Sequence, residues 1–426
     1  MSCMEGAYAA VSTAVRPFLP GYLQRRLERG KEIAARLPER FGEATRERPP
    51  GRLVWLHGAS VGETLSSLPL LNRLLELNPD LHILVTSGTV TSASLMEKRL
   101  PPRAFHQFVP LDAPAYVLRF LQYWKPDAVL WLESELWPGL LAGVRRRNIP
   151  AALVNARLSA KSARNWRWAS GWIRLMLSTF TVVLAQSKGD AVRLQGLDAP
   201  NVQLAGNLKF TAPALAGSAD SLAALLAVVG DRPRWIMAST HEGEEAIAVA
   251  VHRKLMQNWP ELLTIIVPRH PERAESIVAE LGNVPLTRRS TGALPGRGTG
   301  IYLADTLGEL GTIYSAAPIA CVGGSFSGKG GHNPIEPAQC GCAVLAGPDM
   351  GNFLDVAAEL TEAGALVQVA DGEALAREVE ALLANSSELT KRQRAGLQAT
   401  QQQERILASV LSGLAPVLSS AGLRTT

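Results

Sequence analysis

The feature that most restricts the fold is a repeated alternation of short apolar runs with amphipathic, helix-like segments, which begins at residue 51. In the first half of the chain the apolar runs are residues 53–56, 83–85, 128–132, 151–154 and 181–184. Segments such as residues 65–77 and 138–147 lie between them. Parallel strands buried on both faces have continuous apolar sequences, and each crossover between them requires a helix. This half is therefore predicted to be a doubly wound α/β domain.

The same alternation returns in the second half of the chain. Its apolar runs are residues 235–237, 263–267, 301–303, 319–322, 343–345 and 366–369. Between the halves, residues 207–220 are rich in Ala, Gly, Ser and Pro, which predicts a linker. Two α/β halves of similar size predict a cleft between them, with ligands bound at the carboxyl ends of the strands.

The first 50 residues do not share this pattern. An apolar segment, residues 7–15, is shorter than the roughly 20 residues of a spanning helix, and Arg16, Pro17 and Pro20 follow it. Apolar residues then recur at helical spacing beside basic ones, namely Leu23, Leu27, Ile33 and Leu37 with Arg25, Arg26, Arg29 and Lys31. This pattern fits a helix on an anionic membrane surface and also a helix packed on the protein's own core. A net charge of +5 favours anionic partners without choosing among phosphates, nucleic acid and membrane.

The cysteines argue against a disulfide or zinc framework. The chain has four of them, with no CxxC pair and no zinc-like spacing. Such usage is typical of the reducing cytoplasm. No Asp-x-Asp pair follows a predicted strand, so a divalent metal site is not expected either.

In the first half, two acidic motifs follow predicted strands. Glu63 comes after Gly58 and Gly62, in the first turn of a predicted helix. There a carboxylate could act as a general base, although a helix cap is the commoner role of such a glutamate. Glu133 and Glu135 follow the run at residues 128–132, where two acids exceed what one helix cap requires.

A basic and aromatic stretch follows in residues 155–174. Arg157, Lys161, Arg164, Arg167 and Arg174 alternate with Trp166, Trp168 and Trp172. This composition suits a phosphate-bearing lipid or a membrane interface, and it would also suit single-stranded nucleic acid. An exposed basic helix with tryptophans packed inward is the structural alternative.

In the second half, three motifs fit anion binding. Residues 239–245 combine a Ser/Thr cap with a helix start, which is either an anion site or a capping box. Arg269 and His270 end a predicted strand, where Arg can grip a phosphate. Two glycine pairs, in residues 323–324 and 330–331, precede a helix expected near Pro334 and could cradle a phosphate. Glu336, one turn into that helix, could accept the hydroxyls of a ribose.

Together these motifs resemble one family, the 3-deoxy-D-manno-octulosonic acid (Kdo) transferases of lipopolysaccharide assembly. The resemblance covers roughly residues 20–410 and is carried by motifs at residues 58–63, 133–138, 155–159, 206–210, 268–273, 305–310, 323–326 and 331–337. Each motif is modest alone, but their shared order is highly specific.

The resemblance implies a fold, a reaction and a set of site residues. It implies a GT-B glycosyltransferase architecture, CMP-Kdo as a donor substrate, no cofactor and no divalent metal. The acceptor would be a lipid A precursor, lipid IVA, at the cytoplasmic side of the inner membrane, with no nucleic-acid partner. By matching motif, Glu63 would be the general base, and Glu133 and Lys209 would stabilise the transition state. The residues expected to hold CMP are Arg269, His270, Leu307, Gly308, Glu309, Asn333, Pro334, Ile335 and Glu336.

These expectations define four segments. Residues 1–50 are predicted to be a membrane-associating segment, residues 51–210 the acceptor domain, residues 211–220 the linker, and residues 221–426 the donor domain with the C-terminal helices. Many members of the family carry a longer apolar anchor at the N-terminus, but in this chain Arg16, Pro17 and Pro20 interrupt the apolar segment. A surface helix is therefore predicted, and a short spanning segment is the alternative. The functional alternatives are a GT-B transferase with a UDP-sugar donor and a non-catalytic nucleotide- or nucleic-acid-binding protein.

Overall fold

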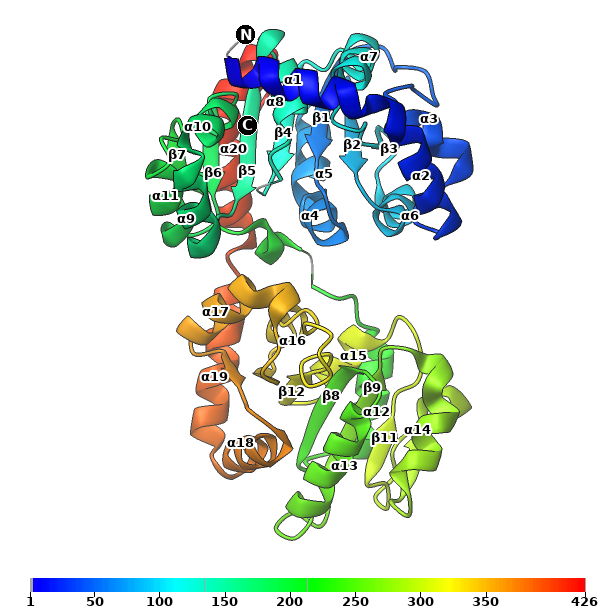
Figure 1. Ribbon diagram of the computed structural model, residues 1–426. Helices are drawn as coiled ribbons and strands as arrows, with labels where there is room; N and C mark the ends of the chain where they lie inside the picture. Colours follow the sequence, from blue (N-terminus) through cyan, green and yellow to red (C-terminus); the bar gives the residue numbers. More distant parts are fainter. Residues whose placement is uncertain (1–2, 134, 213, 426) are drawn as a thin grey trace. The chain divides into compact units, whose positions relative to one another are not determined.

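A computed structural model describes residues 3–133, 135–212 and 214–425 of the chain. Ser134 of the second acidic motif and Pro213 of the predicted linker lie outside the described residues, as do Met1, Ser2 and Thr426. The chain divides into two compact units (Figure 1). Unit 1 comprises Met1–Ala212 and Gln403–Thr426, and unit 2 comprises Pro213–Gln402.

Unit 1 is built on a seven-stranded parallel sheet with the order β3-β2-β1-β4-β5-β6-β7. The strands are β1 (Arg52–His57), β2 (Leu81–Ser87), β3 (Ala104–Phe108), β4 (Ala128–Leu132), β5 (Ala151–Ala156), β6 (Val182–Ala185) and β7 (Val202–Leu204). The order reverses between β1 and β4, which makes the carboxyl ends of these two strands the switch point of the sheet. The doubly wound α/β prediction is confirmed for this unit.

Helices cover both faces of this sheet, as parallel strands require. They are α4 (Val61–Ser66), α5 (Leu68–Leu77), α6 (Val90–Arg99), α7 (Pro114–Trp124), α8 (Pro138–Arg146), α9 (Ala160–Trp168), α10 (Ser170–Leu177) and α11 (Lys188–Gln195), with the short helix η3 (Leu208–Thr211). The helix expected over residues 65–77 is interrupted at Ser67, so α4 is a separate single-turn element at the carboxyl end of β1.

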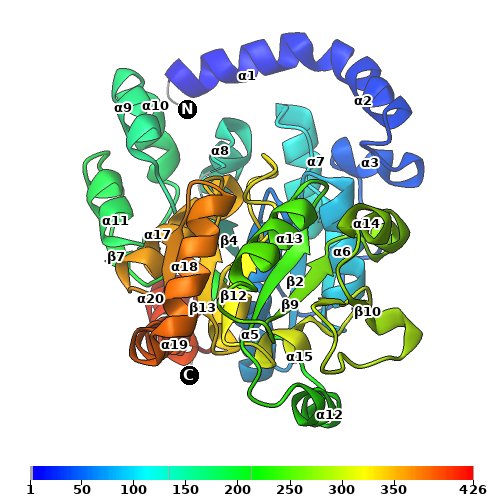
Figure 2. The same cartoon turned by 90° about the horizontal axis from the view of Figure 1, so that it is seen from below.

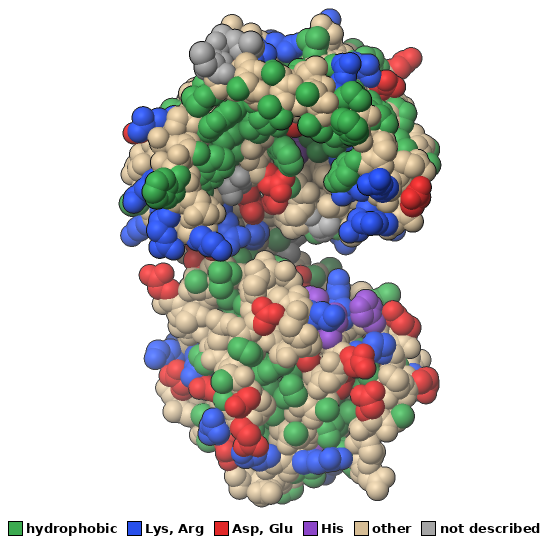
Figure 3. Space-filling model, in the orientation of Figure 1, with side chains coloured by type: hydrophobic (Ala, Val, Ile, Leu, Met, Phe, Trp, Pro, Cys, Tyr) green, Lys and Arg blue, Asp and Glu red, His purple; other side chains and the backbone are tan. Residues whose placement is uncertain are grey.

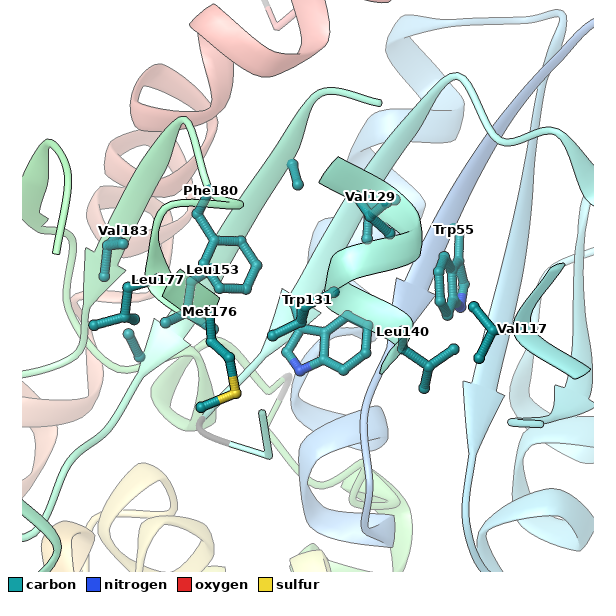
Figure 4. Close-up of a cluster of buried hydrophobic side chains, with 14 of the residues drawn as sticks. Trp55, Val117, Val129, Trp131, Leu140, Leu153, Met176, Leu177, Phe180 and Val183 are labelled. Carbon is teal, nitrogen blue, oxygen red and sulfur yellow. The ribbon is translucent and has the colours of Figure 1, made fainter. Parts of the chain in front are cut away.

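Two tryptophans of adjacent strands form the centre of one core layer in unit 1. Trp55 of β1 and Trp131 of β4 are fully buried, with ring centroids 5.6 Å apart. Figure 4 shows Val117 of α7 and Leu140 of α8 beside them. Burial of large side chains here stabilises the strand ends that carry the acidic motifs.

Unit 2 repeats the architecture with the strand order β10-β11-β9-β8-β12-β13-β14, again all parallel. Its strands are β8 (Arg234–Thr240), β9 (Leu263–Pro268), β10 (Leu286–Arg288), β11 (Ile301–Leu303), β12 (Ile319–Val322), β13 (Ala343–Ala346) and β14 (Leu366–Gln368). Its helices are α12 (Ala219–Val229), α13 (Glu244–Leu255), η4 (Pro271–Arg273), α14 (Ala274–Leu281), η5 (Arg289–Thr291), α15 (Leu310–Ser315), α16 (Ile335–Gln339), η6 (Gly351–Phe353), α17 (Leu354–Glu362), α18 (Gly372–Ala384) and α19 (Ser386–Thr400).

The last helix corrects the predicted domain boundary. α20 (Gln403–Ser420) belongs to unit 1, although residues 221–426 were assigned to a single domain. Its apolar face buries Val410, Leu414 and Val417 against β5, β6 and η3. Beyond it, the backbone N–H of Arg424 donates to the Asn78 side chain at 2.8 Å. The helix therefore covers apolar strands of unit 1 that would otherwise face water.

The N-terminal segment is part of unit 1 rather than a separate module. It contains α1 (Cys3–Val15), η1 (Arg16–Phe18), α2 (Leu19–Glu28), η2 (Ala34–Arg36) and α3 (Leu37–Arg40), and Figures 1 and 2 show α1 and α2 as an outer layer of this unit. The single helix expected over residues 23–37 is wrong, because α2 ends at Glu28. Leu23 is buried, and buried Glu39 accepts a hydrogen bond from the Phe108 N–H at 2.6 Å. Among the described residues, no helix is both long and apolar enough to cross a membrane.

Candidate active site

The first acidic motif forms the start of α4, at the carboxyl end of β1. Ser60 is the N-cap, and the Glu63 carboxylate accepts hydrogen bonds from the Ser60 hydroxyl at 2.7 Å and the Ala59 N–H at 2.8 Å. This is a capping-box arrangement, so the structural role considered from the sequence is present. It also fixes the carboxylate at the switch point of the sheet, with only 9% of the residue exposed.

The second acidic motif separates its two carboxylates. Glu133 follows β4 with φ of 54°, a left-handed conformation that is strained for a glutamate. Its carboxylate lies 3.1 Å from the Lys209 ammonium, and both side chains are mostly buried. Glu135 is exposed, and its carboxylate accepts from the Trp137 indole at 3.3 Å. The structure therefore brings Glu133, not Glu135, together with Lys209.

Two asparagines position Lys209. Asn155, at the end of β5 with φ of 54°, accepts a hydrogen bond from the Leu208 N–H at 2.9 Å. Asn207 caps η3 by accepting from the Lys209 N–H at 3.0 Å. Both belong to motifs that carry the family resemblance, but their positioning role was not predicted, because it depends on contacts between distant segments.

The electrostatic environment makes Glu63 the group best suited to exchange a proton near neutral pH. Burial and the nearby Glu133 carboxylate raise the pKa of Glu63 to about 7, although hydrogen bonds from Ser60 and Ala59 oppose the shift. A carboxylate with such a pKa can accept a proton at physiological pH and still be a useful base.

Because the pKa of Glu63 is raised from 4.5, ionisation of this residue is predicted to lower stability as pH increases. Between pH 4.5 and 7 the folded chain keeps a proton that the unfolded chain has lost. The full penalty, about 3 kcal/mol, is present only above pH 7. Urea unfolding of wild type and Glu63→Gln should show the variant gaining relative stability from pH 5 to pH 8. A stability difference that does not change over this range would contradict the assignment.

In unit 2, the predicted nucleotide residues follow the carboxyl ends of the strands. Arg269 and His270 follow β9 and are exposed. Asn333 donates to the Glu336 carboxylate at 3.2 Å and accepts from the Ile335 N–H at 3.1 Å. Burial raises the pKa of Glu336, while Asn333 and Arg269 lower it. Arg269 thus interacts electrostatically with the Asn333–Glu336 turn, and α16 starts at Ile335, as the helix expected near Pro334 predicts.

The remaining predicted segment lies between β11 and α15. Leu307 and Gly308 are exposed, and Gly308 has φ of 84°. The Glu309 carboxylate pairs with Arg289 at 2.7 Å and also accepts from Thr306. Since this carboxylate already has two partners, the backbone of residues 307–309 is the part that remains available to a ligand.

Sequence reasoning missed a buried carboxylate and a histidine pair in unit 2. Glu244, at the start of α13, accepts hydrogen bonds from the N–H groups of His241, Gly324 and Phe326 at 2.7–2.9 Å. His241 and His332 are in direct contact. The motif at residues 239–245 was identified, but its pairing with the glycine-rich loop depends on the adjacency of β8 and β12.

The basic and aromatic stretch of residues 155–174 begins at the end of β5 and continues through α9 into α10. Lys161, Arg164 and Arg167 are exposed, and Trp168 is 95% exposed. Trp166 packs against the core, and Trp172 stacks edge-on with Tyr8 of α1. The structural alternative is therefore confirmed for Trp166 and Trp172, which pack inward, whereas lipid binding by this stretch stays a prediction.

Comparison with known proteins agrees with this architecture and with the motifs. Residues 35–212 match the family model described as 3-Deoxy-D-manno-octulosonic-acid transferase (kdotransferase). The chain is 38% identical to the protein named probable 3-deoxy-D-manno-octulosonic acid transferase, mitochondrial, of Arabidopsis thaliana, over 91% of this chain and 90% of that one. It is 36% identical to the 3-deoxy-D-manno-octulosonic acid transferase of Haemophilus influenzae, over 90% and 91% of the two chains. A solved UDP-GlcNAc 2-epimerase from Neisseria meningitidis shares the fold, with a TM-score of 0.58 and 14% identity over 86% of this chain and 100% of that one.

Proposed function

Because this chain belongs to the 3-deoxy-D-manno-octulosonic acid (Kdo) transferase family and is a glycosyltransferase of the GT-B fold, we propose that it transfers Kdo from CMP-Kdo to lipid IVA. In this proposal the transfer inverts the configuration at the anomeric carbon and releases CMP. Membership in a transferase family argues against the non-catalytic alternative.

The observation that carries the proposal is the Glu63–Glu133–Lys209 constellation in unit 1. A carboxylate with a pKa of about 7 lies beside a second carboxylate that is paired with an ammonium group. A simple cap requires only Ser60 and Glu63. The buried Glu133–Lys209 pair and the strained backbone of Glu133 are unnecessary for capping and are typical of a functional site.

The chemistry follows from these charges. The oxygen of the acceptor hydroxyl attacks the anomeric carbon of Kdo, and Glu63 accepts the proton of that hydroxyl as the new bond forms. The bond from that carbon to the phosphate oxygen breaks, and its electron pair leaves with CMP. The transition state has oxocarbenium character, so a nearby carboxylate such as Glu133 favours it, and Lys209 keeps this carboxylate ionised and oriented.

For the donor, we assign CMP to unit 2. Arg269 and His270, the backbone of residues 307–309 and the Asn333–Glu336 turn supply cationic, N–H and carboxylate groups at the carboxyl ends of β9, β11 and β12. These groups suit a phosphate and a ribose. A UDP-sugar donor is the remaining alternative, and competition between CMP and UDP for binding would separate the two.

The direct test is formation of Kdo-lipid IVA from lipid IVA and CMP-Kdo generated in situ, followed by mass spectrometry. We expect product and CMP, and the same rate when EDTA is added after the donor has been formed, because no step of the proposed transfer uses a divalent metal. CMP should compete with the donor more strongly than UDP. A folded protein that binds CMP but gives no product would exclude the proposed acceptor, and stronger competition by UDP would exclude the donor.

We also propose that unit 1 docks on the cytoplasmic surface of the inner membrane. Phe18 of η1 is 75% exposed, Val11, Val15 and Tyr22 are exposed near it, and Arg16, Arg25 and Arg29 are exposed in the same segment. Figure 2 shows α9, which ends at Trp168, and α10 beside the N-terminal end of α1. Apolar side chains surrounded by basic ones suit an anionic lipid surface.

Vesicle flotation is expected to show binding to anionic vesicles, release by high salt and little binding to neutral vesicles. Phe18→Ser combined with Trp168→Ser should weaken binding at least roughly tenfold, because each side chain contributes about 1.5–3 kcal/mol when buried. Val192→Ser removes another exposed apolar side chain, from α11, and is the control. Retention on vesicles at high salt would instead support the spanning alternative.

A further inference from the structure

Two histidine side chains of unit 2 share one hydrogen bond. His241 follows β8 and His332 follows β12, and their Nε2 atoms are 2.9 Å apart with nearly parallel ring planes, 9° from each other. One Nε2 must carry the hydrogen and the other must accept it. The neutral pair therefore contains two protons, and it can gain a third on the Nδ1 of the donor ring without losing the bond. The bond would then be charge-assisted and stronger.

The surrounding backbone holds the pair in place. Glu244, 1% exposed, accepts from the N–H of His241 and also from those of Gly324 and Phe326, which ties the segment after β8 to the glycine-rich loop. The His332 N–H donates to the Gly323 carbonyl at 3.1 Å. Gly324 has φ of 69°, and a Cβ there would lie 3.1 Å from the His332 ring. The glycine thus allows the close approach of the ring.

The charges around the pair keep it neutral in the absence of a ligand. Arg269 and His270 face it from the end of β9, Lys329 from the loop after β12, and Glu244 from α13. Burial, with Arg269, His241 and His270, lowers the pKa of His332 to about 4. Burial, with His270, Lys329 and Arg269, also lowers the pKa of His241, and Glu244 opposes this shift. Figure 3 shows histidine side chains gathered beside cationic ones on this face of unit 2.

We propose that the His241–His332 pair takes up one proton from solvent when a phosphate monoester dianion binds beside Arg269. This inference rests on the proposed assignment of CMP to unit 2. The donor is a phosphodiester with one negative charge, whereas the released CMP is a monoester with nearly two at pH 7. The additional charge is created when the bond between carbon and oxygen breaks. A pair that gains a proton in response to this charge stabilises the leaving group preferentially over the donor.

Calorimetry of CMP binding to the full chain at pH 7.5, in buffers with different ionisation enthalpies, measures the number of protons taken up. We expect an uptake approaching about one proton per CMP bound. Cytidine, which lacks the phosphate, should cause none. His332→Asn and His241→Asn should each reduce the uptake to near zero while CMP still binds, with weaker affinity.

Each outcome is decisive for one of the two proposals. CMP binding without proton uptake in wild type would exclude protonation of the histidine pair and leave the assignment of CMP to unit 2 intact. Uptake that persists in both His332→Asn and His241→Asn would assign the proton to another group, the exposed His270 being the nearest candidate, and would also overturn the pair. Absence of CMP binding in the folded wild type would remove the donor assignment itself and the inference with it.

Discussion

Replacement of Glu63 by glutamine is expected to lower kcat for Kdo transfer by about 10²–10⁴-fold, the usual contribution of a general base. Glutamine has nearly the same shape and can still accept from the Ala59 N–H, so α4 should keep its cap. It cannot accept a proton from the acceptor hydroxyl. Because the proton acceptor is needed in the transition state and not for binding the donor, the KM for CMP-Kdo should change little.

The matched control for this variant is Glu135→Gln. Glu135 lies two residues beyond Glu133 but is exposed and directed toward Trp137. Its replacement should leave kcat near the wild-type value and shift the acidic limb of the pH profile only slightly. Wild-type activity should rise through about pH 7 as Glu63 ionises. Equal activities of Glu63→Gln and wild type, or equal losses in both variants, would remove Glu63 from the role of base.

Three strands, β3, β7 and β10, were not predicted from apolar runs in the sequence, and they show where this criterion fails. β3, β7 and β10 are each at an edge of a sheet, and they include polar or exposed residues such as His106, Gln203 and Arg288. An edge strand has a neighbour on one side only and need not be continuously apolar. The interior strands are buried on both faces, so their sequences were sufficient.

The placement of α20 and the composition of the site could not be read from local patterns. The C-terminal helices were expected from the sequence, but only the folded chain shows that α20 has a buried apolar face and packs on unit 1. Glu63 and Glu133 follow predicted strands, which made them candidates, whereas Lys209 was a candidate through the family resemblance alone. Its contact with Glu133 depends on Asn155, whose role is visible only in three dimensions.

Removal of the Lys209 ammonium is the second change with a large expected effect. Lys209→Met keeps an unbranched side chain of nearly the same length but leaves the Glu133 carboxylate without its cationic partner, in a mostly buried position. Loss of one preorganised electrostatic partner typically costs about 10²–10³-fold in kcat. The unpaired carboxylate of Glu133 also opposes ionisation of Glu63 more strongly, so the acidic limb of the pH profile should move to higher pH.

The double variant Lys209→Met with Glu133→Gln separates the two contributions of the lysine. If Lys209 acts mainly by holding and neutralising Glu133, the double variant should be no slower than Lys209→Met, and its pH profile should return toward that of wild type. If Lys209 also acts directly on the reacting atoms, the two losses should multiply. Lys188→Met removes an exposed lysine of α11 in the same unit and should leave kcat unchanged. A Lys209→Met enzyme within a few-fold of wild type, with an unshifted pH profile, would show that the Glu133–Lys209 pair is structural and that Glu63 works without it.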